Sequence, residues 1–183
     1  DCPRAVSDTD ITFVIVPTPS GPDGNFSNRF VLEACQDIGK GLAAKGTYHL
    51  VVLSSTVMPG STGGEVRRVL EQSSGKTCGV DFGLCYGPTF VALGSVIRDI
   101  LNPDYLLVGE SDTAAGELLQ GLYANLCEND PPVARMNFIN AELAKLANNT
   151  FVSTKITFGN MLSQICEQLL GADVDVVTAA MGL

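Results

Sequence analysis

The sequence has no tryptophan, a single histidine and no run of basic residues, and each shortage argues against a class of function. Its 11 Lys and Arg against 20 Asp and Glu give a formal net charge of -9. Such a balance argues against nucleic acid or an anionic membrane surface as a partner. No stretch has the apolar length of a membrane-spanning helix. No group of His, Cys and carboxylates has the spacing of metal ligands, so no metal is expected.

The six cysteines follow no regular spacing and include no CxxC pair. A chain of 183 residues that is 45% hydrophobic can bury a core without disulfides. We therefore expect reduced thiols, several of them buried in helical or strand patterns, at Cys2, Cys35, Cys78, Cys85, Cys127 and Cys166.

Short apolar runs alternate with stretches of helical periodicity over the first 130 residues. Strands are expected at residues 11–16, in "HLVVLSS", near 83–86 and in "DYLLVGES"; helices are expected at 28–46, in "TGGEVRRVLEQSSG" and in "TAAGELLQGLYANLCEN". Strands that alternate with crossover helices predict an α/β fold with a doubly wound parallel sheet. The apolar runs are continuous, as expected when helices cover both faces.

Hydroxyl side chains follow two of these strands. Thr18 comes after the first strand, between two prolines, and Ser55 and Thr56 come after the second. Ligands of such sheets bind beyond the carboxyl ends of the strands, which favours a ligand role for these hydroxyls. The alternative is that they bond nearby backbone in turns or helix caps.

From residue 137 the helical periodicity continues for more than thirty residues, up to Gly171. A helix of that length typically links domains or forms an oligomer interface. Lys145, Asn149 and Ser153 recur at steps of four and share one face. Spacing alone favours a solvated lysine; the sharper alternative is a cation and an amide that hold an oxyanion or a water.

Four segments in this order resemble the UDP-glucose/GDP-mannose dehydrogenase family, whose members are NAD-dependent nucleotide-sugar dehydrogenases. They are "FVIVPTPSGPDGNFS", "VVLSSTVMPGST", "YGPTFVALGSVIRDILNPDYLLVGE" and "AELAKLANNTFVSTKITFGNMLSQICEQLLGADVDVV". The resemblance covers essentially the whole chain. It implies the C-terminal half of a doubly wound, Rossmann-like parallel sheet, followed by a long central helix that forms a homodimer.

The resemblance also implies roles for individual residues. The NAD site would be lined by Pro17, Thr18, Pro19, Ser55 and Thr56, with Thr56 close to the reacting centre. Lys145 and Asn149 match the groups that stabilise the oxyanion and order the water while the sugar's primary alcohol is oxidised. The implied chemistry is two hydride transfers at C6, from alcohol to aldehyde to acid, through a covalent intermediate on a cysteine.

The family's Asn-Pro-Glu-Phe-Leu is "GPTFV" in this chain. Thr89 replaces a glutamate associated with base chemistry, and threonine cannot act as a carboxylate base. Thr89, Phe90 and Val91 still match the substrate-binding positions. The family's GxGxxG turn and nucleophilic cysteine have no counterpart among these residues, and none of the six cysteines is assigned that role.

Three interpretations follow. The first is a cytoplasmic, homodimeric nucleotide-sugar 6-dehydrogenase, with residues 1–136 as a partial NAD-binding domain and 137–183 as a central helical dimerisation domain. The second is a catalytically inactive fragment or dimerising interaction module. The third is a β-hydroxyacid-type dehydrogenase, against which the "VPTPS" and "STVMPG" pair argues.

Overall fold

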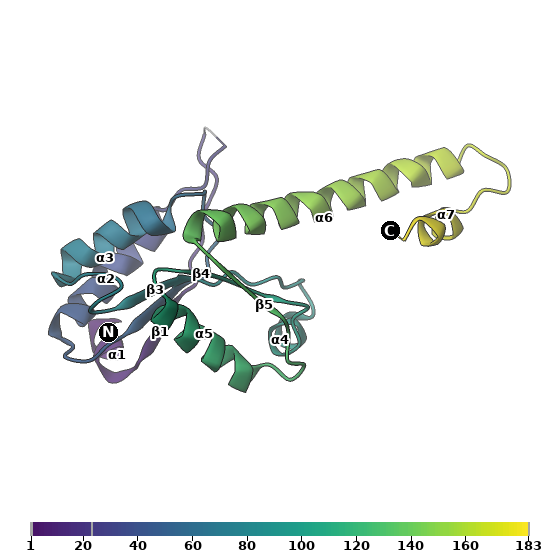
Figure 1. The fold of residues 1–183 in the computed structure, drawn as a ribbon. Coiled ribbons are helices and arrows are strands. Elements are labelled where there is room, and N and C mark those ends of the chain that lie inside the picture. Colours follow the sequence, from purple (N-terminus) through teal and green to yellow (C-terminus); the bar gives the residue numbers. More distant parts are fainter. Residues whose placement is uncertain (1, 23, 183) are drawn as a thin grey trace. The chain divides into compact units, whose positions relative to one another are not determined.

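The computed structural model describes residues 2–22 and 24–182. The chain forms two compact units, Asp1–Leu143 and Ala144–Leu183. The first unit contains a five-stranded sheet with helices on both faces, and the second contains most of one long helix and a short one (Figure 1). This confirms the expected α/β fold class followed by a long helix.

The five strands lie side by side in sequence order. They are β1 (Ile11–Val14), β2 (Leu50–Leu53), β3 (Gly83–Tyr86), β4 (Leu106–Glu110) and β5 (Val133–Met136). β1, β2 and β3 are parallel neighbours, with Ile11 opposite Leu50 and Leu50 opposite Gly83. Every residue of β2 and β3 is buried, which explains their continuous apolar runs.

One strand pair departs from the parallel pattern that the sequence predicted. β3 and β4 are antiparallel, with Cys85 opposite Glu110, whereas β4 and β5 are parallel again. A parallel neighbour needs a crossover that carries the chain back to the starting edge. The segment between β3 and β4 contains only the six-residue α4 (Val96–Leu101). β4 therefore runs in the opposite direction, and its last residues pair with the last residues of β3.

Helices α2 (Arg29–Ala44) and α3 (Arg67–Ser74) pack together on one face of the sheet, and α5 (Thr113–Leu126) covers the other (Figure 1). A short η1 (Thr62–Val66) leads into α3. The sequence reading did not identify α4, β5 or α1 (Cys2–Asp8). α1 depends on tertiary contacts: the buried Lys45 ammonium donates hydrogen bonds to carbonyls at its C-terminal end, including that of Val6.

The long helix α6 (Phe138–Cys166) begins inside the first unit, where its first turn packs tightly. A Cβ added at Gly109 of β4 would lie 2.9 Å from the Ala141 Cβ and 3.3 Å from the Phe138 Cα. At Gly63 it would lie 3.1 Å from the Phe138 ring. Glycines in β4 and η1 therefore allow α6 to approach the sheet closely.

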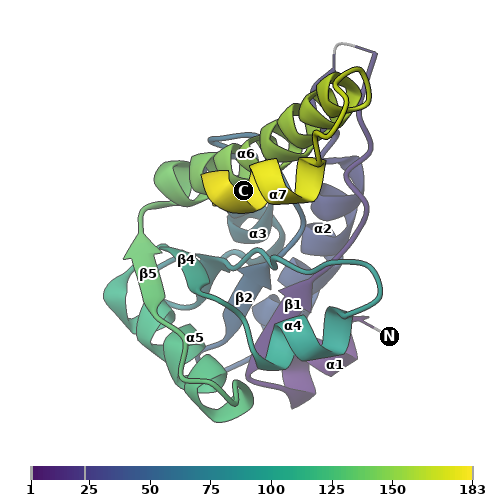
Figure 2. The ribbon, with the colours of Figure 1, turned by 90° about the vertical axis from the view of Figure 1, so that its right-hand side faces the viewer.

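In the second unit α6 continues to Cys166, and the chain then reverses direction into α7 (Val174–Met181) (Figures 1 and 2). Asp173 caps α7, because its carboxylate accepts the backbone N–H groups of Asp175 and Val176; the sequence left Asp173 and Ala172 as alternatives for the start of this helix. Large apolar side chains of this unit are well exposed, among them Phe151, Ile156, Met161, Leu170 and Val176.

Gly109→Ala is expected to destabilise the protein by about 1–3 kcal/mol, because the added methyl meets Cβ and backbone atoms that cannot move aside. Gly121→Ala in α5 is the matched control. Nothing lies within 4 Å of its added Cβ, and alanine favours a helix over glycine by about 1 kcal/mol. Urea unfolding of both variants should show opposite shifts; equal stabilities would contradict the close approach of α6.

Candidate functional site at the carboxyl ends of the strands

Ser55 joins the end of β2 to the segment after β1. Its Oγ accepts a hydrogen bond from the Val16 backbone N–H at 2.9 Å and donates to the Val16 carbonyl at 2.7 Å. The Ser55 hydroxyl is thus fully committed to backbone. These partners match the alternative that the sequence left open, bonding to nearby backbone, and the contact of Ser55 with a cofactor stays a prediction.

Two further hydroxyls act in the same way. Thr18 donates to the Thr56 carbonyl at 2.7 Å, and Ser54 donates to the Gly87 carbonyl at 2.8 Å. Together with Ser55 they connect the ends of β1, β2 and β3. Ser54 was missed by sequence reasoning, although it belongs to the same Ser-Ser-Thr run. The Thr56 hydroxyl makes no hydrogen bond within residues 2–22 and 24–182, so it is the one available to a ligand.

Pro17 and Pro19 are exposed, and both flank Thr18 in the segment that Ser55 and Thr18 fasten beside β2. Proline has a fixed φ and no backbone N–H, so the two prolines stiffen this segment and contribute no backbone donor to its surface. The structure brings all five residues predicted for the cofactor to the carboxyl ends of neighbouring parallel strands, where ligands of such sheets bind.

Thr89, Phe90 and Val91 follow β3 and line a small pocket of about 40 Å³ with residues of the α4 region and the start of β4. The Phe90 and Tyr105 ring centroids are 4.7 Å apart. Asp99 contributes a carboxylate to the pocket wall, but it accepts hydrogen bonds from the Ala92 N–H and the Ser95 hydroxyl. These bonds lower the pKa of Asp99, which makes it a poor base.

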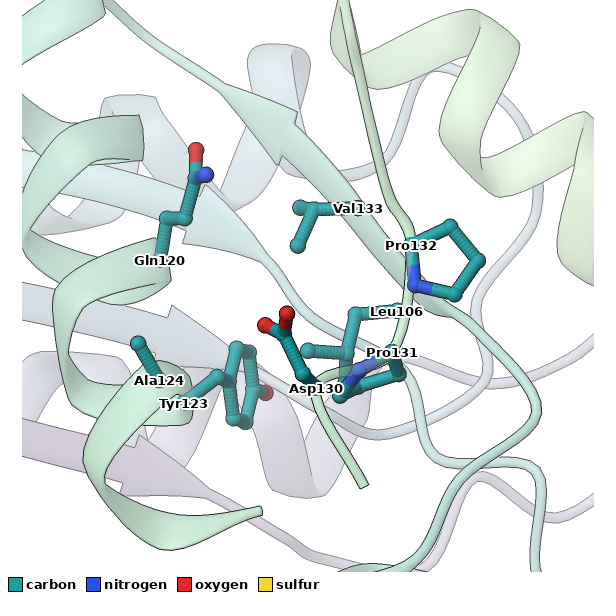
Figure 3. A pocket seen from close by; sticks show the side chains of 8 residues that line it. All are labelled: Leu106, Gln120, Tyr123, Ala124, Asp130, Pro131, Pro132 and Val133. Carbon is teal, nitrogen blue, oxygen red and sulfur yellow. The ribbon is translucent and has the colours of Figure 1, made fainter. Parts of the chain in front are cut away.

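A larger pocket of about 280 Å³ adjoins this one and shares Leu106 and Tyr123 with it. Figure 3 shows its walls, with the Asp130 carboxylate and the Gln120 amide among apolar neighbours. The Gln120 carbonyl oxygen accepts a hydrogen bond from Arg135 at 3.3 Å. The segment that carries Thr89 thus lines the smaller pocket, whereas the larger pocket is formed by the start of β4, by α5 and by residues 130–133.

Glu142 in the first turn of α6 is completely buried. Its carboxylate accepts the backbone N–H of Gly60 at 2.6 Å and that of Thr62 at 2.7 Å. Burial, followed by the charge of Glu142, raises the pKa of Tyr86 above its usual range. Sequence reasoning missed Glu142, although an acidic residue between alanine and leucine in "NAELAKL" was a signal for it.

Lys145 is 7% exposed, so it is not the solvated lysine that spacing alone favoured. Burial lowers the pKa of its ammonium group. Asn149, one turn further along, is exposed, and the exposed Ser153 donates to the Asn149 carbonyl of the same helix. The buried part of the predicted polar stripe is therefore Lys145 alone.

The remaining reactive side chains have structural surroundings. His49 is buried, and its ring nitrogens contact the Thr12 hydroxyl and the Thr9 carbonyl. Burial raises the pKa of the Cys35 and Cys85 thiols to about 12, so neither is a ready nucleophile. Among the described residues no group of His, Cys, Asp and Glu could hold a metal, and no helix could cross a membrane.

The chain matches two family models. Residues 1–127 match the NAD-binding domain of the UDP-glucose/GDP-mannose dehydrogenase family, and residues 139–183 match its central domain. Among curated relatives, GDP-mannose 6-dehydrogenase of Pseudomonas savastanoi pv. phaseolicola is 36% identical over 91% of this chain and 37% of its own length. UDP-glucose 6-dehydrogenase AglM of Haloferax volcanii is 36% identical over 97% of this chain and 42% of its own.

Solved structures that resemble this chain are dehydrogenases of the same kind. A ternary complex of GDP-mannose dehydrogenase from Pseudomonas aeruginosa has a TM-score of 0.91 at 34% identity, over 98% of this chain and 40% of that one. UDP-glucose dehydrogenase from Pyrobaculum islandicum has a TM-score of 0.88 at 38% identity, over 100% and 41%. The chain thus spans about two-fifths of the length of these relatives. The predicted family, NAD cofactor and Rossmann-like class are confirmed: the chain belongs to the UDP-glucose/GDP-mannose dehydrogenase family.

Proposed function

We propose that the complete protein containing this chain oxidises a nucleotide sugar at C6, from alcohol to acid, with NAD. Family membership supports the reaction class, since relatives over 91–97% of the chain are GDP-mannose and UDP-glucose 6-dehydrogenases. The structural observation that carries the proposal is the buried lysine, Lys145, whose pKa is lowered. Desolvated lysines of this kind cluster at functional sites.

The residues at the strand ends fit a cofactor. Thr56 offers an uncommitted hydroxyl beside a stiff segment formed by Pro17, Thr18 and Pro19, and Ser55 holds that segment against the end of β2. We assign cofactor binding to these five residues. NAD, when bound, supplies the hydride acceptor. The hydrogen bonds of Ser55 and Thr18 hold the binding surface in place before any ligand arrives.

Lys145 and Asn149 are assigned to the reacting carbon. An ammonium group in a water-poor site stabilises the oxyanion that develops when the alcohol loses its proton. The Asn149 amide, one helical turn away, orders a water. Thr89, Phe90 and Val91 contact the substrate from the pocket after β3. Residues 1–136 then act as a partial NAD-binding domain.

An inactive protein is the second candidate, and one observation favours it. Thr89 occupies the position of the family's glutamate, and the nearby Asp99 is committed to Ala92 and Ser95. No carboxylate in the described part of this pocket is therefore free to act as a base. Hydrolysis of the covalent intermediate is the step that such a loss slows first.

We also assign residues 137–183 to a homodimer interface. Apolar side chains of α6 and α7 are exposed by a third or more, from Phe151 to Met181, and a second copy that covers them buries this surface. Light scattering on the complete protein is expected to give twice the monomer mass; a monomer contradicts the assignment.

We place the enzyme in the cytoplasm, where a nucleotide sugar and NAD are both available.

NADH formation tests the function. The complete protein is mixed with NAD and, in separate reactions, with GDP-mannose and UDP-glucose. Steady NADH formation with one of the two supports the proposal and names the sugar. Tight NAD binding without any NADH supports the inactive protein instead.

Lys145→Ala should lower kcat by about 10²–10³-fold and leave the Kd for NAD nearly unchanged, since an oxyanion donor acts at the reacting carbon. The exposed Lys40→Ala serves as the control.

In the unmutated enzyme kcat should fall as the pH rises through the lowered pKa of Lys145, below the range of free lysine. Lys145→Arg, which stays charged, should abolish this alkaline loss. Equal losses of turnover and NAD affinity in Lys145→Ala would instead indicate a structural lysine.

Thr89→Glu should increase the steady-state rate of NADH formation, because it restores a carboxylate where the family has one. Thr89→Gln has the same shape without the charge and should not increase the rate. A rate for Thr89→Glu equal to that of the parent would show that the missing carboxylate does not limit turnover.

A further inference from the structure

We infer that Glu142 is a positioning residue for the proposed reaction: it fixes the loop after Thr56 to the first turn of the helix that carries Lys145. The inference rests on the proposed function, in which Thr56 and Lys145 act on cofactor and substrate. Glu142 itself touches neither; it acts through the groups that it holds.

Glu142 connects two segments that are distant in sequence, and we call this connection, formed by Glu142, Gly60 and Thr62, the joint. Its carboxylate accepts the N–H groups of Gly60 and Thr62, which are 82 and 80 residues away in sequence. The side chain is completely buried, so water cannot replace either bond. Charge-assisted bonds of 2.6 and 2.7 Å to rigid backbone donors fix both position and direction.

The joint connects the two predicted parts of the site by short stretches of chain. Thr56 lies four residues before Gly60, and its carbonyl is held by Thr18. Lys145 lies three residues after Glu142 in the same helix. Removing the joint lets the loop and the helix shift independently.

Side-chain packing holds the first turn of α6 against the sheet but does not hold the loop at Gly60. Gly109 and Gly63 let Phe138 and Ala141 approach β4 and η1 closely, which sets the distance of the first turn of α6 from the sheet. Gly60 has nothing within 4 Å of its added Cβ and a φ of 94°, so no side-chain packing restrains it. Its carbonyl accepts a local hydrogen bond from the Gly64 N–H at 3.0 Å, and its own N–H, bonded to Glu142 at 2.6 Å, ties it to the first turn of α6.

The test compares Glu142→Gln with the parent in the complete enzyme. Glutamine keeps the shape, but its NH₂ group cannot accept from a backbone N–H, so one of the two bonds is lost. We expect kcat to fall about 10- to 100-fold and the KM for NAD to rise, at a temperature where circular dichroism shows a fully folded protein. The control is Glu110→Gln, which weakens a part-buried ion pair with Arg135 outside the joint.

The outcomes are distinct. A folded Glu142→Gln variant with kcat within about twofold of the parent, or a loss no greater than in Glu110→Gln, overturns the inference while the proposed function stands. A parent that forms no NADH overturns the proposed function, and the inference with it. If Glu142→Gln does not fold, Glu142→Asp decides: it keeps the charge but is one methylene shorter, and an intermediate kcat supports the joint, whereas full activity overturns it.

Discussion

The buried carboxylate of Glu142 is the constraint on which the site end of the molecule depends. Burying a charge is unfavourable unless it is fully hydrogen-bonded, and here two backbone N–H groups supply the bonds. Leaving either N–H without a partner costs about 1–3 kcal/mol. Loop 57–62 and the first turn of α6 therefore keep one mutual arrangement, and the glycine at 109 lets that turn lie directly on β4.

A second set of bonds acts across the sheet. Ser54, Ser55 and Thr18 connect consecutive strand ends through backbone atoms, so β1, β2 and β3 end in one fixed edge rather than in three independent loops. Preorganisation of this kind lowers the entropy that a ligand loses on binding. The polar residues at this edge thus divide into those that build the surface, such as Ser55, and those that remain available to a ligand, such as Thr56.

The sequence predicted much of this arrangement because periodicity and strand-end chemistry are local. Continuous apolar runs predicted β2 and β3, and both are buried strands in the structure. The direction of β4 was not predictable in the same way, because it depends on the absence of a crossover between residues 87 and 105. Likewise the end of α1 and the residue after it are held by hydrogen bonds that the Lys45 ammonium donates to their carbonyls. Lys45 lies 36 residues or more away in sequence, so no local pattern predicts these bonds.

Roles at the site were harder to predict than positions. Spacing placed Lys145 and Asn149 on one face, but only the fold shows that Lys145 is buried and Asn149 exposed. Ser54 and Glu142 were missed because their partners are backbone groups far away in sequence, and the local signals, the Ser-Ser-Thr run and the acidic residue in "NAELAKL", do not reveal those partners. A hydroxyl or carboxylate that bonds distant backbone looks in sequence like any other polar residue.

Hydrogen–deuterium exchange at the Gly60 and Thr62 amides of the complete protein tests the central claim most directly. If the buried Glu142 carboxylate holds both, they should exchange as slowly as the core amides of β2, Leu50–Leu53. Exchange at the rate of an exposed loop would contradict the account, because the loop and the helix would then not be fixed to each other.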